Sequence, residues 1–179
     1  MIRILVAYGS KHGGTAEIAE WIATALRGRG LQADVMSGGE VRDVRPYDAV
    51  IIGGALYAGI WHKNARKLVR RHLHDLKERP VWLFSSGPLD HKAEAGDPEE
   101  AKGVTKAAHR LGARGQICFG GVLAPDAEGM IASSMAKKLA GDYRDPDQIA
   151  AWASGIADEL AAENSTGHVA HHGSADQRS

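Results

Sequence analysis

The chain opens with an apolar run, Ile4-Leu5-Val6-Ala7-Tyr8, that leads into the turn Gly9-Ser10-Lys11-His12-Gly13-Gly14-Thr15. Apolar residues then recur at helical spacing from Ala16 to about Arg27. We therefore expect a buried strand, a turn and a helix whose N-terminus faces that turn. The turn matches neither the P-loop nor the dinucleotide-binding pattern. Its hydroxyls, backbone N–H groups and glycines suit a small phosphate monoester, and the alternative is an ordinary strand-to-helix connection.

Length and composition predict one domain. The chain has 179 residues, with 22 Lys and Arg against 22 Asp and Glu. Nothing in this balance therefore argues for bulk nucleic-acid binding or for an acidic partner surface. We also expect no membrane span, no signal peptide and a cytoplasmic location. The single cysteine, Cys118, leaves no intramolecular disulfide and no multi-cysteine metal site, and we expect it to be an inert core residue.

The remaining apolar patterns predict an alternation of strands and helices. Strands are expected at 31–36, 47–54, 80–87 and 116–123, and helices at 62–76, 97–113, about 130–139 and from 145 to about 163. Residues 1–163 would form the domain and 164–179 a disordered C-terminal tail. His168, His171 and His172 lie in that tail, where we expect no metal site.

Five strands alternating with helices indicate an α/β fold, a three-layer sandwich around a parallel sheet of order 2-1-3-4-5. In such sheets ligands bind beyond the carboxyl ends of the strands, near the switch between the first and third strand. The loops at that edge would be 9–15, 54–61 and 85–91, which are rich in glycine, hydroxyls or aromatic residues. Topology and loop chemistry thus indicate the same edge.

These motifs resemble the flavodoxin-like family. Its phosphate loop has the form [ST]-x-T-G-x-T, and Ser10-x-His12-Gly13-x-Thr15 matches three of the four fixed positions, with histidine in place of a threonine. The loop Gly53-x-x-Leu56-Tyr57-x-Gly59-x-Trp61-His62-Lys63 is most similar to the branch that contains menaquinone-dependent protoporphyrinogen oxidase. The resemblance covers about residues 1–162 and implies a non-covalently bound FMN.

The resemblance also implies where the cofactor would bind. The FMN phosphate would be surrounded by Ser10, Lys11, His12, Gly13, Gly14 and Thr15. The ribityl chain and the ring would lie along Leu56, Tyr57, Ala58, Gly59 and Trp61, with Tyr57 preferred to Trp61 for stacking. Backbone groups and hydroxyls of Ser85, Ser86, Gly87 and Pro88 would approach the other side of the ring. No catalytic residue is assigned.

The implied function is an FMN-dependent oxidoreductase resembling protoporphyrinogen oxidase, which passes electrons from a reduced organic substrate to an acceptor such as a quinone. The alternatives are an electron carrier without its own substrate and a stand-alone flavin-binding module. A redox partner or quinone-type acceptor is expected, while peripheral membrane contact and the oligomeric state stay open. The basic face formed by Lys63, Arg66, Lys67, Arg70 and Arg71 is either solvated or a docking surface for an acidic redox partner or anionic lipid.

Overall fold

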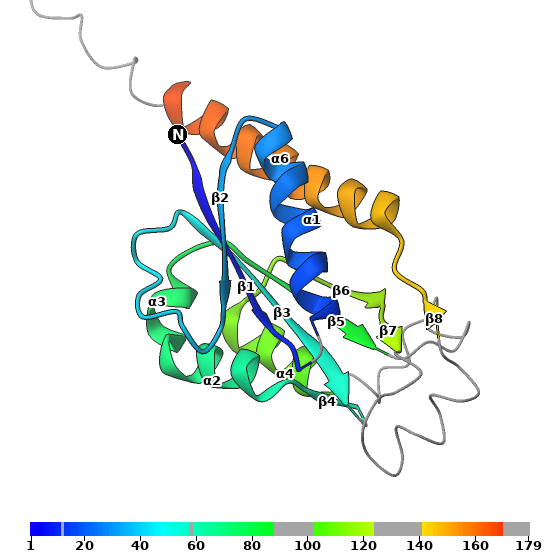
Figure 1. The fold of residues 1–179 in the computed structure, drawn as a ribbon. Helices are drawn as coiled ribbons and strands as arrows, with labels where there is room; N and C mark the ends of the chain where they lie inside the picture. The colour runs from blue at the N-terminus through cyan, green and yellow to red at the C-terminus, as the bar shows by residue number, and fades with distance from the viewer. Residues whose placement is uncertain (12, 58, 88–101, 124–140, 170–179) are drawn as a thin grey trace, which may run out of the picture.

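The computed structural model describes residues 1–11, 13–57, 59–87, 102–123 and 141–169 (Figure 1). Its strands are β1 (Arg3–Gly9), β2 (Gln32–Ser37), β3 (Ala49–Tyr57), β4 (Ile60–Trp61), β5 (Val81–Gly87), β6 (Gly115–Gly120), β7 (Val122–Leu123) and β8 (Gly141–Asp142). Its helices are α1 (Gly14–Gly28), α2 (Lys63–Arg71), α3 (Leu73–Lys77), α4 (Lys102–Leu111) and α6 (Pro146–Val169).

The main sheet has the predicted topology. Its strands follow the order β2-β1-β3-β5-β6, and the pairs along this path are all parallel. Since β5 and β6 are the fourth and fifth long strands, the expected order 2-1-3-4-5 is confirmed. The sequence patterns did not predict the short β4, which pairs antiparallel with β3, or the separate β7–β8 pair.

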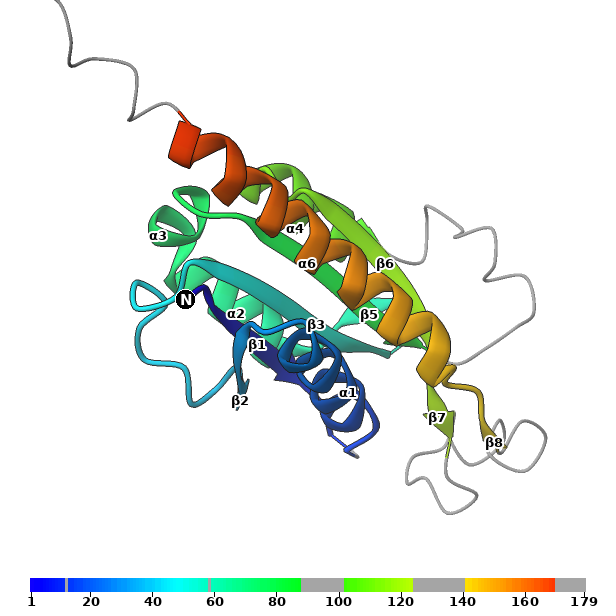
Figure 2. The same cartoon turned by 90° about the horizontal axis from the view of Figure 1, so that it is seen from above.

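Helices cover both faces of the sheet (Figures 1 and 2). Buried residues of α1 and α6 pack in one core with Val6 and Ile51, and those of α2, α3 and α4 pack in the other with Leu5 and Ile52. Neighbouring strand residues therefore contribute to opposite cores, because successive side chains of a strand point to opposite faces. This double burial explains why the strands read as continuous apolar runs.

Gly53 allows the central strand to pass beneath an aromatic ring. A Cβ atom added there would lie 1.9 Å from Cζ of Phe84, on the neighbouring strand β5. The Phe84 ring in turn packs 5.9 Å from Phe119 and 6.4 Å from Trp152, measured between ring centroids. The glycine at this position is thus required by packing within the core.

Three sequence-based expectations need correction. The single helix expected at 62–76 is divided at His72, where the backbone leaves helical geometry (φ −111°, ψ 23°). The last helix continues beyond residue 163 to Val169, so the expected disordered tail begins in helix; residues 170–179 lie outside the described residues. Cys118 is exposed and not in the core, because β6 lies at the edge of the sheet and its residues alternate between exposed and covered.

Two expected helices lie partly or wholly outside the described residues. The first turn of the helix predicted at 97–113 cannot be compared, whereas α4 occupies its second part. The short helix predicted at about 130–139 lies entirely outside the described residues. Among the described residues, no helix combines the length and apolar character that a bilayer crossing requires.

Candidate functional site

The strand register brings three loops to one edge of the sheet. Gly9 of β1 is paired with Gly54 of β3, and Gly54 is paired with Ser85 of β5. The segments that follow these residues therefore start side by side at the carboxyl edge. This is the edge at which the sequence predicts a ligand.

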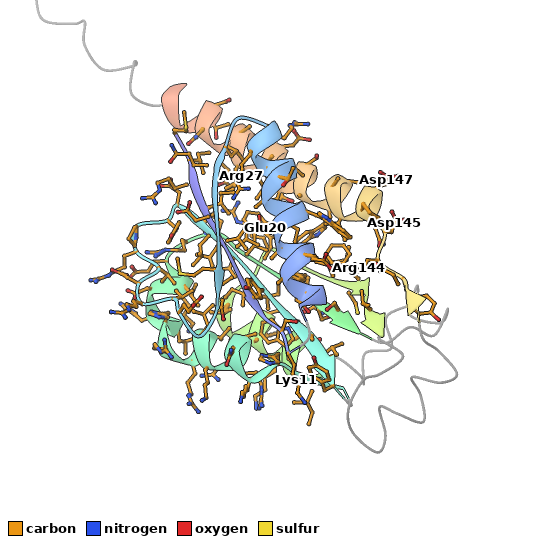
Figure 3. The ribbon with its side chains drawn as sticks, viewed as in Figure 1. Lys11, Glu20, Arg27, Arg144, Asp145 and Asp147 are labelled. Carbon is orange, nitrogen blue, oxygen red and sulfur yellow. The ribbon has the colours of Figure 1, made fainter. Side chains whose placement is uncertain are left out.

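The first loop presents the N-terminus of α1. Gly13 caps this helix in a left-handed conformation (φ 86°), and its N–H donates to Oγ of Ser10 over 3.0 Å. The first intrahelical bond runs from the N–H of Glu17 to the carbonyl of Gly13. The N–H groups of residues 14–16 precede this bond and are available to an anion, as is usual at a helix N-terminus. Lys11 is exposed near the end of β1 (Figure 3), and His12 lies outside the described residues.

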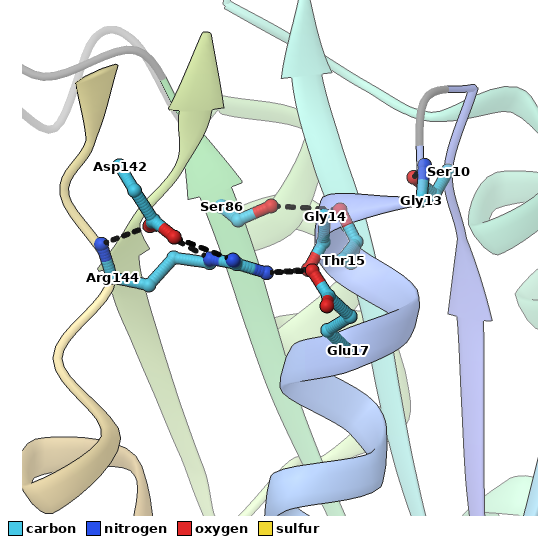
Figure 4. Close-up of polar contacts among 8 residues, drawn as sticks. All are labelled: Ser10, Gly13, Gly14, Thr15, Glu17, Ser86, Asp142 and Arg144. Atoms are coloured by element: carbon cyan, nitrogen blue, oxygen red, sulfur yellow. Dashed lines mark hydrogen bonds and ion pairs between the residues drawn. The ribbon is translucent and has the colours of Figure 1, made fainter. Parts of the chain in front are cut away.

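A buried hydroxyl pair joins this loop to the end of β5. Oγ1 of Thr15 lies 2.8 Å from Oγ of Ser86, and either group can be the donor (Figure 4). Thr15, Ser85 and Ser86 are all at least 95% buried. The sequence assigns Thr15 to the phosphate of the ligand and Ser86 to its ring. These two residues are thus joined by a direct hydrogen bond.

The β3–β4 hairpin separates its two aromatic residues. Tyr57 pairs with Ile60, and both are exposed, at 42% and 56%. Leu56 pairs with Trp61, and both are buried. Tyr57 is therefore accessible to a ligand at the carboxyl edge. Gly59 shapes the turn with a positive φ of 71°, and Ala58 lies outside the described residues.

Trp61 is a core residue, and this corrects the expectation that it lies against the ring of a ligand. Its side chain is 1% exposed, and its Nε1 donates to the carbonyl of Phe84 over 3.3 Å. A Cβ atom at Gly54 would lie 2.6 Å from the same Nε1, so the indole rests directly on β3. Of the two aromatic candidates only Tyr57 can offer a ring face.

His62 connects the hairpin to α2. Its Nδ1 accepts a hydrogen bond from the N–H of Asn64 over 3.2 Å and so caps this helix. The ring of His62 lies against Gly9, where an added Cβ atom would be 2.6 Å from Nδ1. The centroids of the His62 and Tyr57 rings are 6.2 Å apart. Burial lowers the pKa of His62, and the positive charges of Lys63 and Arg66 lower it further. Burial raises the pKa of Tyr57, against the opposing effect of a backbone hydrogen bond with Lys11.

Two glycines bring the start of β7 against the end of β5. A Cβ atom on Gly121 would lie 2.7 Å from the carbonyl oxygen of Gly87. The next residue, Val122, is 43% exposed and lies 3.5 Å from where a Cβ atom of Gly14 would be. Val122 therefore borders the N-terminus of α1, which the sequence did not reveal. Pro88 lies outside the described residues.

Arg144 is the main residue near the site that the sequence analysis missed. Its Nε and Nη2 donate to the two carboxylate oxygens of Asp142 over 2.8 and 2.6 Å. Its Nη1 pairs with Glu17 and donates to the carbonyl of Gly14 over 3.3 Å (Figure 4). The guanidinium lies 4.8 Å from the ring centroid of Trp21, and the side chain is only 7% exposed.

This network fixes the first turn of α1 to the segment between β8 and α6. The hydrogen bonds from Arg144 lower the pKa of Asp142, and those to Asp142 and Glu17 raise the pKa of Arg144. The guanidinium therefore stays charged. The sequence places Arg144 next to Asp142, but no local pattern shows that it reaches a helix about 130 residues earlier.

A cavity of about 280 Å³ is lined by residues of α1 and β2 and does not coincide with these loops. Its lining includes three carboxylates, those of Glu17, Glu20 and Glu40, which disfavour an anion. The carboxyl-edge loops are thus the better candidate for a phosphate-bearing ligand. Within the described part of the chain, no cluster of three or more His, Cys, Asp or Glu side chains has the geometry of a metal site.

Comparison with known proteins agrees with this architecture. A family model described as a flavodoxin domain matches residues 5–147, and the chain belongs to this family. Among solved structures, a flavodoxin of Streptococcus pneumoniae TIGR4 is similar with a TM-score of 0.57 at 19% identity, covering 90% of this chain and 99% of that one. A cysteine-to-serine mutant of a Pseudomonas aeruginosa flavodoxin gives a TM-score of 0.56 at 15% identity, covering 88% and 97%. At these identities the structures establish the fold alone.

A curated relative gives a more distant functional comparison. Protoporphyrinogen IX dehydrogenase [quinone] of Escherichia coli strain K12 is 28% identical over 100 residues. This match covers 55% of this chain and 55% of the relative, and the proteins of two further E. coli strains match equally. The chain thus spans about half the length of the curated relatives it matches.

Proposed function

We propose that this protein binds FMN at the carboxyl edge of its sheet and acts as an oxidoreductase. One observation carries the proposal: the register row Gly9–Gly54–Ser85 brings an open helix N-terminus and an exposed tyrosine to the same edge. A mononucleotide with a flat ring needs an anion site for its phosphate and an aromatic surface for its ring, and in parallel sheets such ligands bind at this edge.

The residues at the phosphate end fit the cofactor. Gly13, Gly14 and the N–H groups of residues 14–16 would bind the phosphate, and the exposed Lys11 would add a positive charge. Apart from its chain neighbours, no atom of the described residues lies within 4 Å of the position that a Cβ atom of Gly13 would occupy, so the backbone is open there. Thr15 and Ser86 would hold the base of the site through their shared hydrogen bond.

At the ring end, Tyr57 would cover one face of the flavin, and the residues of β5 would approach the opposite side. The half-buried His62 stays neutral at neutral pH because its pKa is lowered, so it places no positive charge beneath Tyr57. FMN itself would supply the redox chemistry, while stacking and hydrogen bonds from the chain tune it.

Within this proposal the substrate is a reduced organic molecule and the acceptor is a quinone. The support is the 28% identity to protoporphyrinogen IX dehydrogenase [quinone] over about half of each chain. The second candidate, an electron carrier without its own substrate, is favoured by the exposed cations of α2 beside the hairpin, which have no ion-pair partner among the described residues. The two are separated by assaying protoporphyrinogen IX oxidation with a quinone acceptor, because only the oxidoreductase turns over above background.

The cofactor assignment is tested first on the purified protein. We expect a yellow protein whose absorbance is accounted for by FMN released on denaturation. A colourless protein that does not bind added FMN would refute the proposed function.

Substitutions then test the phosphate end. Thr15→Ala should weaken FMN binding by about 1.5–3 kcal/mol, because a hydroxyl near a charged group and its bond to Ser86 are lost. Gly13→Glu should abolish measurable binding, since it adds a like charge and strains a residue with φ 86°. Thr24→Ala, an exposed threonine on the same helix, is the matched control. If fluorescence titration gives the parental affinity for both site variants, the phosphate is placed incorrectly.

A further inference from the structure

The overall neutrality of the chain conceals two oppositely charged helical layers. α2 contains five Lys and Arg and no Asp or Glu, and the exposed Lys106 and Arg110 of α4 lie in the same layer. On the other face, α6 contains four Asp and Glu and no Lys or Arg, and α1 adds Glu17 and Glu20. Figure 3 shows Glu20 and Asp147 on this second layer. The even charge count therefore does not show how the charges are distributed over the surface.

The cations of α2 are not neutralised within the described residues. Lys63, Arg66, Lys67 and Arg70 are exposed, and no carboxylate of the described chain lies within ion-pair distance of them. On the opposite layer four of the six carboxylates of α1 and α6 are paired: Glu17 with Arg144, Glu20 with Arg27, Asp158 with Arg29 and Glu163 with Arg114. The unbalanced charge is thus concentrated on the α2 face.

This charge lies beside the candidate flavin site. α2 begins at Lys63, directly after the β3–β4 hairpin that carries Tyr57. Lys63 and Arg66 contribute to lowering the pKa of His62, so their positive potential extends to the hairpin. A partner held on α2 would therefore lie next to the exposed edge of the proposed flavin.

The chemistry of the face indicates the kind of partner. The exposed large apolar residues of the described chain are Met1, Tyr57, Ile60, Val122 and Tyr143, and none belongs to α2, α3 or α4. The apolar residues of α2, namely Ala65, Leu68 and Val69, are buried in the core and cannot enter a bilayer. A charged face without an apolar anchor supports a brief, salt-sensitive encounter, as in electron transfer between proteins.

We propose that the outer face of α2, formed by Lys63, Arg66, Lys67 and Arg70, is the docking surface for an acidic redox protein. Because most carboxylates of the α1–α6 layer are paired, the α2 face carries the main unbalanced charge and orients an acidic partner toward the flavin edge. The proposal rests on the proposed flavin function for its role in electron transfer, but not for the binding of an acidic partner.

The test compares two variants with the same change in charge. Arg66→Gln with Arg70→Gln removes two cations from the face, and Arg27→Gln with Arg29→Gln removes two from the C-terminal end of α1. Poly-L-glutamate serves as the acidic probe, and its binding is measured by fluorescence anisotropy at low salt. We expect the first variant to bind about tenfold more weakly and the control to bind like the parent. Equal loss in both variants, or none in either, would overturn the proposal.

Oxidation of the reduced holoprotein by ferricyanide tests the link to the flavin. The rate should fall roughly tenfold as salt increases, and the Arg66/Arg70 variant should lose most of this dependence. Poly-L-glutamate binding without flavin in the protein would refute the proposed function but retain the docking surface. Binding to phosphatidylserine vesicles without binding to poly-L-glutamate would instead assign the face to lipid and overturn the proposal of a protein partner.

Discussion

His62 combines a capping role with a titratable ring at the start of α2. Its Nδ1 must be unprotonated to accept the hydrogen bond from Asn64, and its surroundings lower its pKa below the ordinary value of 6.5. The folded protein therefore holds this ring neutral more strongly than the unfolded chain does. In the window below pH 6.5 the unfolded state binds more protons, and the free energy of unfolding falls as the pH is lowered.

We expect the substitution His62→Asn to remove this pH dependence. Asparagine is a good helix cap but does not titrate, so it retains the bond to the backbone while eliminating the proton. Thermal unfolding followed from about pH 7.5 to about pH 5 should show a steeper loss of stability for the parent than for the variant. Parallel curves for the two proteins would show that His62 does not contribute to the pH dependence.

We expect the substitution of glycine by alanine to have opposite effects on stability at Gly53 and at Gly155. Gly53→Ala should destabilise the protein by about 3 kcal/mol or more, because the new methyl group overlaps the Phe84 ring in a packed core. Gly155→Ala lies in α6 with no atom within 4 Å of the added Cβ, and should stabilise by about 0.5–1 kcal/mol through helix propensity. Urea denaturation measures both. A tolerated Gly53→Ala would contradict the packing described for β3 and β5.

Residue types alone predict the site only in part, as Tyr57 and Trp61 illustrate. Both are aromatic residues in a loop at the carboxyl edge, and the sequence treats both as candidates for stacking. The hairpin decides between them, because Leu56 and Trp61 form one inward-facing pair while Tyr57 and Ile60 form the outward-facing pair. Cys118 was misplaced for a related reason, since an apolar run does not show that its strand lies at the edge of the sheet.

At the scale of elements, the contact between α1 and the β8–α6 connection depends on one side chain. Arg144 joins two carboxylates that would repel each other without it, and it stacks on Trp21. Its side chain is buried, but those of Asp142 and Glu17 are 51% and 62% exposed, so solvent screens part of the interaction.

Arg144→Gln should therefore lower the free energy of unfolding by about 1–2 kcal/mol. Arg144→Lys, which retains the charge but not the paired hydrogen bonds to Asp142, should be intermediate. Adding Asp142→Asn and Glu17→Gln to the first variant should restore part of the loss, because no unpaired carboxylates remain. Chemical denaturation of the set gives these differences, and a triple variant no more stable than Arg144→Gln would argue against charge repulsion as the cause.

For the whole molecule, the strand order could be predicted from the spacing of apolar residues, because buried parallel strands and amphipathic helices have distinct periodicities. The break at His72 and the extension of α6 to Val169 did not follow, since both concern where a helix ends. The two charged layers also could not be read from composition. Only the fold shows that α2 and α4 cover one face of the sheet and that α1 and α6 cover the other.

The exposed Cys118 has a practical consequence. It is the only cysteine of the chain, and its register partner on β5 is Ser85, which is itself paired with Gly54. Two strand spacings, about 10 Å, therefore separate the backbone of Cys118 from Gly54, which precedes the hairpin of the candidate site. A maleimide dye attached to the native protein would lie close enough for the proposed FMN to quench its emission. Binding of FMN to this site would then be detected without introducing a mutation.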